Sequence, residues 1–154
     1  MTEYKVWSAI INWIIQNEGH VFGACPPGGS VYGYSRCCLV DVDLNKRDEP
    51  DIMFAIEHTI FLVECKPRLS GLLSTSLKPS EESDVDKLLR ICDNWMSGKY
   101  REQLRANFQI NQDDYRLQPT LGYAQGAREP KWWDARFLRL VLSSDGQVHK
   151  IIEP

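Results

Sequence analysis

The chain has 154 residues, of which 43% are hydrophobic and 25% are charged, and this composition argues against a disordered chain and against a coiled coil. Its 18 Lys and Arg residues are outnumbered by 21 Asp and Glu residues, so the formal charge is −3. This balance disfavours a protein whose main task is to coat nucleic acid, because such binding rests on clustered cations that neutralise phosphates.

The cysteines and the start of the chain indicate a compartment. Five cysteines form an odd set without a Cys-x-x-Cys pair, so they predict neither a zinc ribbon nor a disulfide framework and favour a reducing environment. The first residues, MTEYKVWSAIINWIIQ, lack the pattern of a signal peptide, and no run of about 18 uncharged apolar residues predicts a membrane span. We expect one domain over residues 1–154, located in the cytoplasm and without a membrane partner.

The first predicted element is a helix over residues 2–17, where apolar side chains recur at i, i+3, i+4 and i+7 and Thr2 can cap the start. A short strand and a loop rich in Gly and Pro follow within 21–33. Residues 36–44 alternate between two faces, which predicts a half-buried strand, and the polar run 45–49 predicts a turn.

The central part of the chain predicts a β-hairpin. Two apolar runs, 51–56 and 59–65, are joined at Glu57-His58. A segment rich in Ser, Pro and Gly then predicts a loop over 67–80.

The remaining elements are helices followed by strands. Residues 83–96 and, less regularly, 99–109 have helical spacing. Strands are expected over 119–124, 136–143 and 147–152, the last two joined at a hairpin turn around Asp145-Gly146. The order αβββα(α)βββ predicts an α+β domain of the α/β-sandwich kind, with a mixed central sheet flanked by helices.

Two acidic residues are expected to meet in the central hairpin. If Glu57 and His58 form its turn, antiparallel pairing places Asp51 opposite Glu64. Opposed carboxylates repel each other unless a positive charge lies between them, and a divalent cation removes that penalty. In the purely structural alternative, Asp51 and Glu64 lie on a solvent-exposed strand face and Lys66 is their cross-strand ion-pair partner.

Lys66 is expected beside this acid pair. Period-two alternation puts Leu62, Glu64 and Lys66 on one face of the strand, and Phe61, Val63 and Cys65 on the other, toward the core. Mg²⁺ takes oxygen ligands and keeps several waters, so two carboxylates and an adjacent ammonium group suit phosphodiester hydrolysis. Lys66 could position or deprotonate the attacking water, or stabilise the transition state.

Pro50-Asp51, a gap, and Glu64-Cys65-Lys66 after an apolar strand resemble the PD-(D/E)XK nuclease superfamily, and the pattern is nearest to the N-terminal nuclease domains of type I restriction subunits. The resemblance implies a restriction-endonuclease-like core and a metal-dependent endonuclease that hydrolyses DNA with Mg²⁺, for which Mn²⁺ can substitute. It further implies that Asp51, Glu64 and the Cys65 carbonyl bind metal, that Lys66 is catalytic, and that Glu3 in the first helix assists.

Basic residues are expected to contact DNA. The resemblance suggests Lys87 on the helix after the Glu-x-Lys strand, and we add Arg68, Lys131 and Arg136. Trp132-Trp133, flanked by cations, can stack on bases, although a core or dimer contact is the simpler interpretation. The acidic net charge suggests that a homodimer or a targeting protein partner supplies specificity.

Two alternatives stay open beside the nuclease. The same fold can serve as a catalytically idle subunit that binds nucleic acid or acts as a scaffold. The chain can also be an unrelated α+β interaction protein, such as an immunity or adaptor module. Asp41 and Asp43 share a strand face without an adjacent Lys and are expected to form a solvent-exposed edge, and the three histidines are too isolated to predict a histidine site.

Overall fold

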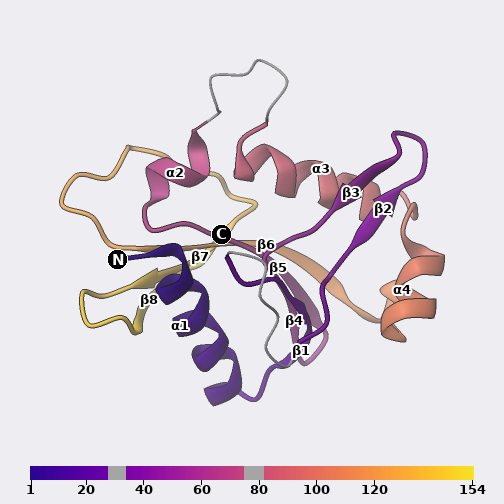
Figure 1. The fold of residues 1–154 in the computed structure, drawn as a ribbon, viewed down its shortest axis with the longest axis horizontal. Coiled ribbons are helices and arrows are strands. Elements are labelled where there is room, and N and C mark those ends of the chain that lie inside the picture. Colours follow the sequence, from indigo (N-terminus) through magenta and orange to yellow (C-terminus); the bar gives the residue numbers. More distant parts are fainter. Residues whose placement is uncertain (28–33, 75–81) are drawn as a thin grey trace.

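A computed structural model describes residues 1–27, 34–74 and 82–154, and its centre is one mixed β-sheet (Figure 1). Six strands lie in the order β1-β4-β5-β6-β7-β8. The pairs β5–β6 and β6–β7 are parallel, and the other pairs are antiparallel. The mixed sheet with helices confirms the predicted α+β class. The strands are β1 (His20–Ala24), β4 (Ile52–Ile56), β5 (Thr59–Cys65), β6 (Arg116–Ala124), β7 (Leu138–Leu142) and β8 (Val148–Ile152).

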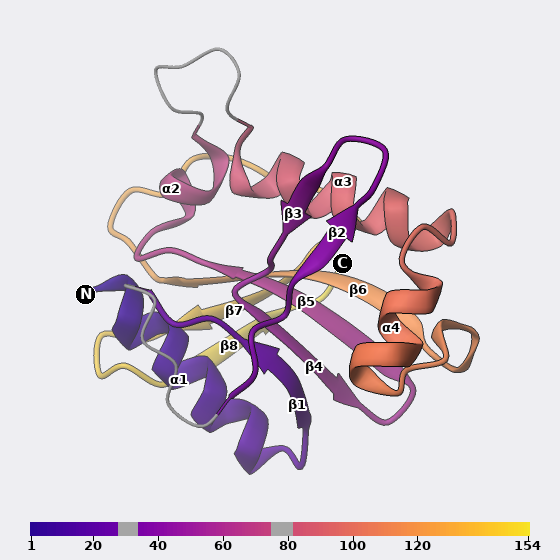
Figure 2. The same ribbon diagram turned by 45° about the vertical axis from the view of Figure 1, so that its right-hand side comes forward.

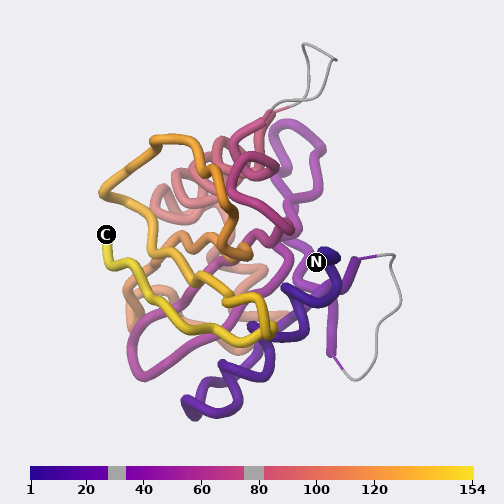
Figure 3. The backbone as a smooth tube through the Cα atoms, turned by 90° about the vertical axis from the view of Figure 1, so that its left-hand side faces the viewer, coloured from indigo at the N-terminus to yellow at the C-terminus, as the bar shows by residue number. Residues whose placement is uncertain are grey.

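Helices cover both faces of this sheet, as the view in Figure 3 shows. Helix α1 (Glu3–Gln16) packs on one face, and α2 (Leu69–Leu73), α3 (Asp84–Met96) and α4 (Arg101–Phe108) lie on the other. A 3-10 turn, η1 (Gln112–Asp114), precedes β6. None of the helices in the described ranges has both the length and the apolar character needed to cross a bilayer.

The central strands are apolar on both faces because each face has its own core. Ile52 and Phe54 belong to the cluster under α1, whereas Met53 and Ala55 belong to the cluster under α3. A strand buried on both sides appears as a continuous apolar run, as 51–56 and 59–65 do. The expectation that only the face with Phe61, Val63 and Cys65 points toward the core is wrong, because Leu62 on the other face is fully buried under α3.

The predicted central hairpin is confirmed together with its register. Phe54 pairs with Phe61 and Ile52 pairs with Val63. Glu57 adopts a φ of 53°, which suits a tight turn. Asp51 stands one residue before β4, next to the end of β5.

The predicted strand over 36–44 is confirmed only for Leu39–Asp41, and the predicted turn over 45–49 is wrong. These residues form a two-stranded arm, β2 (Leu39–Asp41) and β3 (Lys46–Asp48), outside the six-stranded sheet (Figure 2). The Asp41 carboxylate accepts hydrogen bonds from the backbone N–H groups of Asp43 and Leu44, at 3.1 and 3.4 Å. Such an Asx turn stops the strand and starts the reversal early.

The predicted loop over 67–80 is wrong in its first part, which contains α2. Leu69 and Leu72 stand three residues apart and are buried against α3, so this short helix has an apolar face of its own. Residues 75–81 of that prediction, and residues 28–33 of the earlier loop, lie outside the described residues.

The other predictions along the chain are confirmed apart from the number of strands. Helices α1, α3 and α4 and the C-terminal hairpin β7–β8 lie where the pattern placed them, and Gly146 turns that hairpin with a φ of 82°. Five strands instead of three precede the helical segment, because β1 and the arm are separate elements.

Candidate functional site

Asp51 is held at the end of β5 from two directions. Its Oδ2 accepts a hydrogen bond from the backbone N–H of Cys65 at 2.8 Å. Its carbonyl oxygen accepts from the Cys25 N–H at 2.8 Å and from the indole N–H of Trp7 at 3.3 Å. The side chain therefore lies next to Glu64, as the predicted pairing requires.

Glu64 is a buried acid with incomplete hydrogen bonding. Its side chain is 3% exposed, and Lys87 Nζ lies 2.5 Å from its Oε1. That contact is an ion pair without hydrogen-bond geometry, so within the described residues Oε1 accepts no hydrogen bond. Burial, and then the neighbouring Asp51 carboxylate, raise the pKa of Glu64 well above its ordinary value.

Lys66 bridges the two helical layers. Its Nζ lies 3.3 Å from Glu3 Oε1 on α1 and 4.0 Å from Asp84 Oδ2 on α3. Burial lowers the pKa of Lys66, but the Asp84 and Glu3 carboxylates outweigh that effect and raise it above the ordinary lysine value. The group is therefore an ammonium ion at neutral pH.

Lys87 points into the acidic cluster. Its Nζ donates to the Glu49 carbonyl at 2.7 Å besides pairing with Glu64. Burial lowers the pKa of Lys87, and the Glu64 carboxylate more than compensates. Lys87 on α3 therefore lies in the cluster, and its contact with DNA stays a prediction.

The cluster has an excess of acidic over basic side chains. Four carboxylates face two ammonium groups, which leaves two excess negative charges when all are ionised; the carboxylates belong to Glu3, Asp51, Glu64 and Asp84 and the ammonium groups to Lys66 and Lys87. Across the described ranges, no group of three or more His, Cys, Asp or Glu side chains forms a ready-made metal site. Mg²⁺ is commonly bound by one or two carboxylates with waters and substrate phosphates, so Asp51 and Glu64 fit it.

Cys65 takes part through its backbone. Its N–H holds Asp51, while its side chain is fully buried in the cluster under α1. Burial raises the pKa of the Cys65 thiol, so the side chain remains a neutral thiol. The carbonyl stays a predicted metal ligand.

The other predicted basic residues lie outside this cluster. Arg68 is exposed and lines a cavity of about 240 Å³ with Pro67 and Ser144, beside the end of β5. Lys131 is exposed on the segment between β6 and β7. Arg136 pairs with Asp134 at 2.6 Å.

Asp84 lies in the site but could not be identified as a site residue from the sequence. It opens α3 directly after the cap Ser83, whose hydroxyl accepts from the Asp86 N–H at 3.1 Å. Acids in the first turn of a helix are common because they interact favourably with the helix dipole, so sequence alone gives no reason to place Asp84 in a site. The contact with Lys66 depends on how α3 packs against β5.

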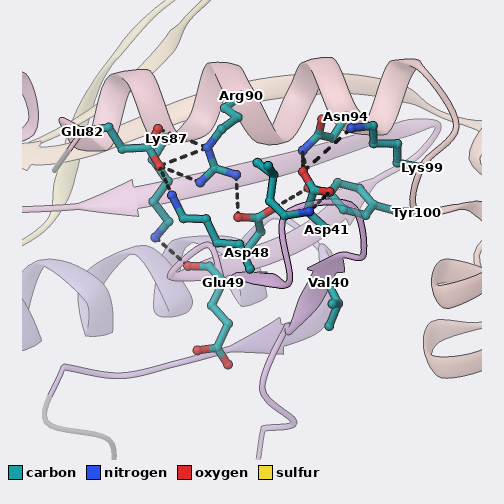
Figure 4. A network of polar contacts seen from close by, with 12 residues as sticks. Val40, Asp41, Asp48, Glu49, Glu82, Lys87, Arg90, Asn94, Lys99 and Tyr100 are labelled. Atoms are coloured by element: carbon teal, nitrogen blue, oxygen red, sulfur yellow. Dashed lines mark hydrogen bonds and ion pairs between the residues drawn. The ribbon is translucent and has the colours of Figure 1, made fainter. Parts of the chain in front are cut away.

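A second network that was missed fastens the arm to α3 and α4 (Figure 4). Asp48 is fully buried and accepts from Arg90 Nη1 at 2.6 Å and from the Tyr100 hydroxyl at 2.5 Å. Asp41 is 1% exposed and accepts from Asn94 Nδ2 at 3.1 Å, so the predicted solvent-exposed edge is wrong at this position. Asp43 remains exposed and pairs with Lys99 at 3.3 Å.

Comparisons with family models, with curated protein sequences and with solved structures give no match for this chain. The site is therefore interpreted from its own chemistry. Two carboxylates meet at the start of one strand and the end of the next, with two lysines around them.

Proposed function

We propose that the protein is a divalent-metal-dependent nuclease with a core of the restriction-endonuclease type, which hydrolyses phosphodiester bonds of DNA. The observation that carries the proposal is the hydrogen bond from the Cys65 N–H to Asp51 Oδ2, which holds Asp51 beside the buried Glu64. Glu64 Oε1 accepts no hydrogen bond from any described residue and contacts the Lys87 ammonium group, so a hard cation that takes the place of this contact would be stabilised by the ionised carboxylate.

Each residue of the site then has a distinct task. Asp51, Glu64 and the Cys65 carbonyl bind Mg²⁺ or Mn²⁺, and such a bound ion offsets phosphate charge and acidifies bound water. Hydrolysis forms a P–O bond to the water oxygen and breaks the P–O bond to the leaving oxygen, which takes up a proton. Lys66 stays charged and stabilises the negative charge that develops on the phosphate.

Glu3 and Asp84 act on Lys66 and not on the substrate. They lie on opposite sides of its ammonium group and come from the first turns of α1 and α3. A flexible lysine held by two carboxylates loses less conformational freedom when the substrate binds. We therefore assign both acids as positioning residues.

The proposal is tested by incubating the purified protein with supercoiled and linear DNA in Mg²⁺ or Mn²⁺. We expect cleavage by the wild type and by Lys150→Ala, an exposed lysine on β8, and none by Lys66→Ala. Cleavage that persists in Lys66→Ala would contradict the assigned site.

A second candidate function is a nucleic-acid-binding or scaffolding subunit with an idle site. It is favoured by the contact of Lys87 with Glu64, which partly neutralises the buried acid without a metal. A nuclease site should bind Mg²⁺ or Mn²⁺ and raise the melting temperature, since saturation at about 100 times Kd stabilises a fold by about 2.7 kcal/mol. An idle subunit should show no such rise.

An unrelated interaction module is not proposed. An interaction module would be favoured if Asp51 and Glu64 lay on different faces of the sheet. Instead, the Asp51 side chain accepts a hydrogen bond from the backbone of the residue after Glu64. The Asp51 carboxylate is also the second cause, after burial, of the raised pKa of Glu64. A homodimer or a targeting partner remains our expectation for how DNA is selected.

A further inference from the structure

The segment over residues 125–137 crosses the sheet edge at which the candidate site lies. It connects the parallel strands β6 and β7, and Gly122 of β6 is in register with Cys65 of β5. Figures 1 and 2 show this segment passing beside α2. A chain bound along it would therefore continue toward Lys66, which directly follows β5.

The two adjacent tryptophans of this segment have different environments. Trp132 packs against the core: its ring centroid lies 5.6 Å from that of Phe137, and the Arg139 guanidinium lies 5.9 Å above its ring. Trp133 is 67% exposed. Packing against the core accounts for Trp132, but it does not explain why the indole of Trp133 is exposed.

Exposed cations without ion-pair partners among the described residues lie on this segment before Trp133 and, from α2's side, against its start. Arg68, Arg128 and Lys131 are exposed, and none of them pairs with an acid within residues 1–27, 34–74 and 82–154. Arg68 and Arg128 line one small cavity of about 40 Å³ between α2 and the segment. The acid in that cavity, Glu129, is already engaged, because its Oε1 accepts from the Gly126 N–H at 3.2 Å.

We propose that residues 125–137 and Arg68 bind a single strand of nucleic acid that leads into the site at Lys66. Exposed cations neutralise backbone phosphates, and an exposed aromatic ring stacks on a base. A duplex presents no free base face along its length, so the isolated indole of Trp133 selects an unpaired strand. This inference rests on the proposed nuclease and deepens it by naming the substrate as single-stranded DNA or an unpaired end.

Binding is measured by fluorescence anisotropy in EDTA, so that cleavage cannot interfere. The probes are a labelled oligo-dT, an oligo-rU and a DNA hairpin of equal length. We expect oligo-dT to bind more tightly than the hairpin, and Trp133→Ala to weaken its binding by about fivefold to 150-fold, the range that one base–aromatic stack contributes. Trp133→Phe should recover most of the affinity, and circular dichroism of both variants checks that the fold is retained.

The cations are tested by the salt dependence of binding. The double variant Arg68→Gln, Arg128→Gln should lower the slope of log affinity against log salt by about 1.4, since each phosphate contact on a single strand contributes about 0.7. The control Arg105→Gln, Arg116→Gln removes the same charge from exposed positions on α4 and at the start of β6. Arg116 stands six residues before Gly122, the residue of β6 that is in register with Cys65. The control should leave the slope unchanged.

The outcomes separate this inference from the proposed function. Equal affinity for oligo-dT and hairpin, no binding at all, or unchanged binding by the Trp133 and Arg variants would overturn it, even if the protein cleaves DNA. Binding that depends on Trp133 supports it even if no cleavage occurs in Mg²⁺. Tighter binding of oligo-rU than of oligo-dT would also support the single-strand surface and would contradict DNA as its ligand.

Discussion

Glu64 makes the stability of the metal-free protein depend on pH. Its pKa is raised in the folded state, so the folded protein holds a proton that the unfolded chain has lost, and stability falls as pH rises from the ordinary glutamate value through the raised one. Glu64→Gln removes this dependence. We expect the stability advantage of the variant over the wild type to grow from pH 5 to pH 8, measured by urea denaturation in EDTA. A difference that does not change with pH would show that Glu64 ionises freely.

Substitution of Glu3 separates two possible roles of its carboxylate, one in the site and one in stabilising α1. A carboxylate that only complements the dipole of α1 contributes less than about 1 kcal/mol of stability and nothing to cleavage. Because Glu3 Oε1 lies 3.3 Å from Lys66 Nζ, we expect Glu3→Gln to slow single-turnover cleavage by about 10-fold to 100-fold, the usual effect of removing an outer-shell partner. Asp86→Asn is the matched control, an exposed acid in the first turn of α3. Equal rates for both variants would assign Glu3 to the helix alone.

At the scale of the element, the arm β2–β3 depends on one buried acid. Arg90→Ala leaves Asp48, which is fully buried, without its cation, and we expect a loss of about 3 kcal/mol. This is the low end for a broken buried pair, because the Arg90 side chain is 22% exposed. Arg101→Ala breaks a pair whose side chains are 45% and 66% exposed and should cost little. Urea denaturation that gives similar losses for both variants would contradict the role assigned to the Arg90–Asp48 pair.

Elements built from local patterns could be predicted, and elements built from distant contacts could not. The β4–β5 hairpin follows from two continuous apolar runs joined at Glu57-His58, and α1 follows from apolar residues at a spacing of 3.6. The arm does not, because Asp41 turns its own chain and because Asp48 finds its partners Arg90 and Tyr100 far along the sequence. In the site, the pairing of Asp51 with Glu64 came from hairpin register, whereas the contact of Asp84 with Lys66 needs the packing of α3.

At the scale of the whole molecule, one sheet carries two cores. Trp7 is buried in the cluster under α1 and Trp95 in the cluster under α3, on opposite faces of the same strands. If residues 1–154 form one domain, both faces unfold together, and tryptophan fluorescence and far-UV circular dichroism should give the same urea midpoint. Two separate transitions would show that the faces unfold independently and would contradict the prediction of a single domain.

The central claim is that Asp51 and Glu64 form a metal site that supports cleavage of DNA. The measurement that tests it most directly is the single-turnover cleavage rate as a function of Mg²⁺ or Mn²⁺ concentration, compared among wild type, Asp51→Asn, Glu64→Gln and the exposed control Glu102→Gln. We predict metal-dependent cleavage by the wild type and by Glu102→Gln, and background rates at all metal concentrations for the other two variants. Cleavage by Glu64→Gln at the wild-type rate, or no metal-dependent cleavage of single-stranded or duplex DNA by the wild type, would contradict the account.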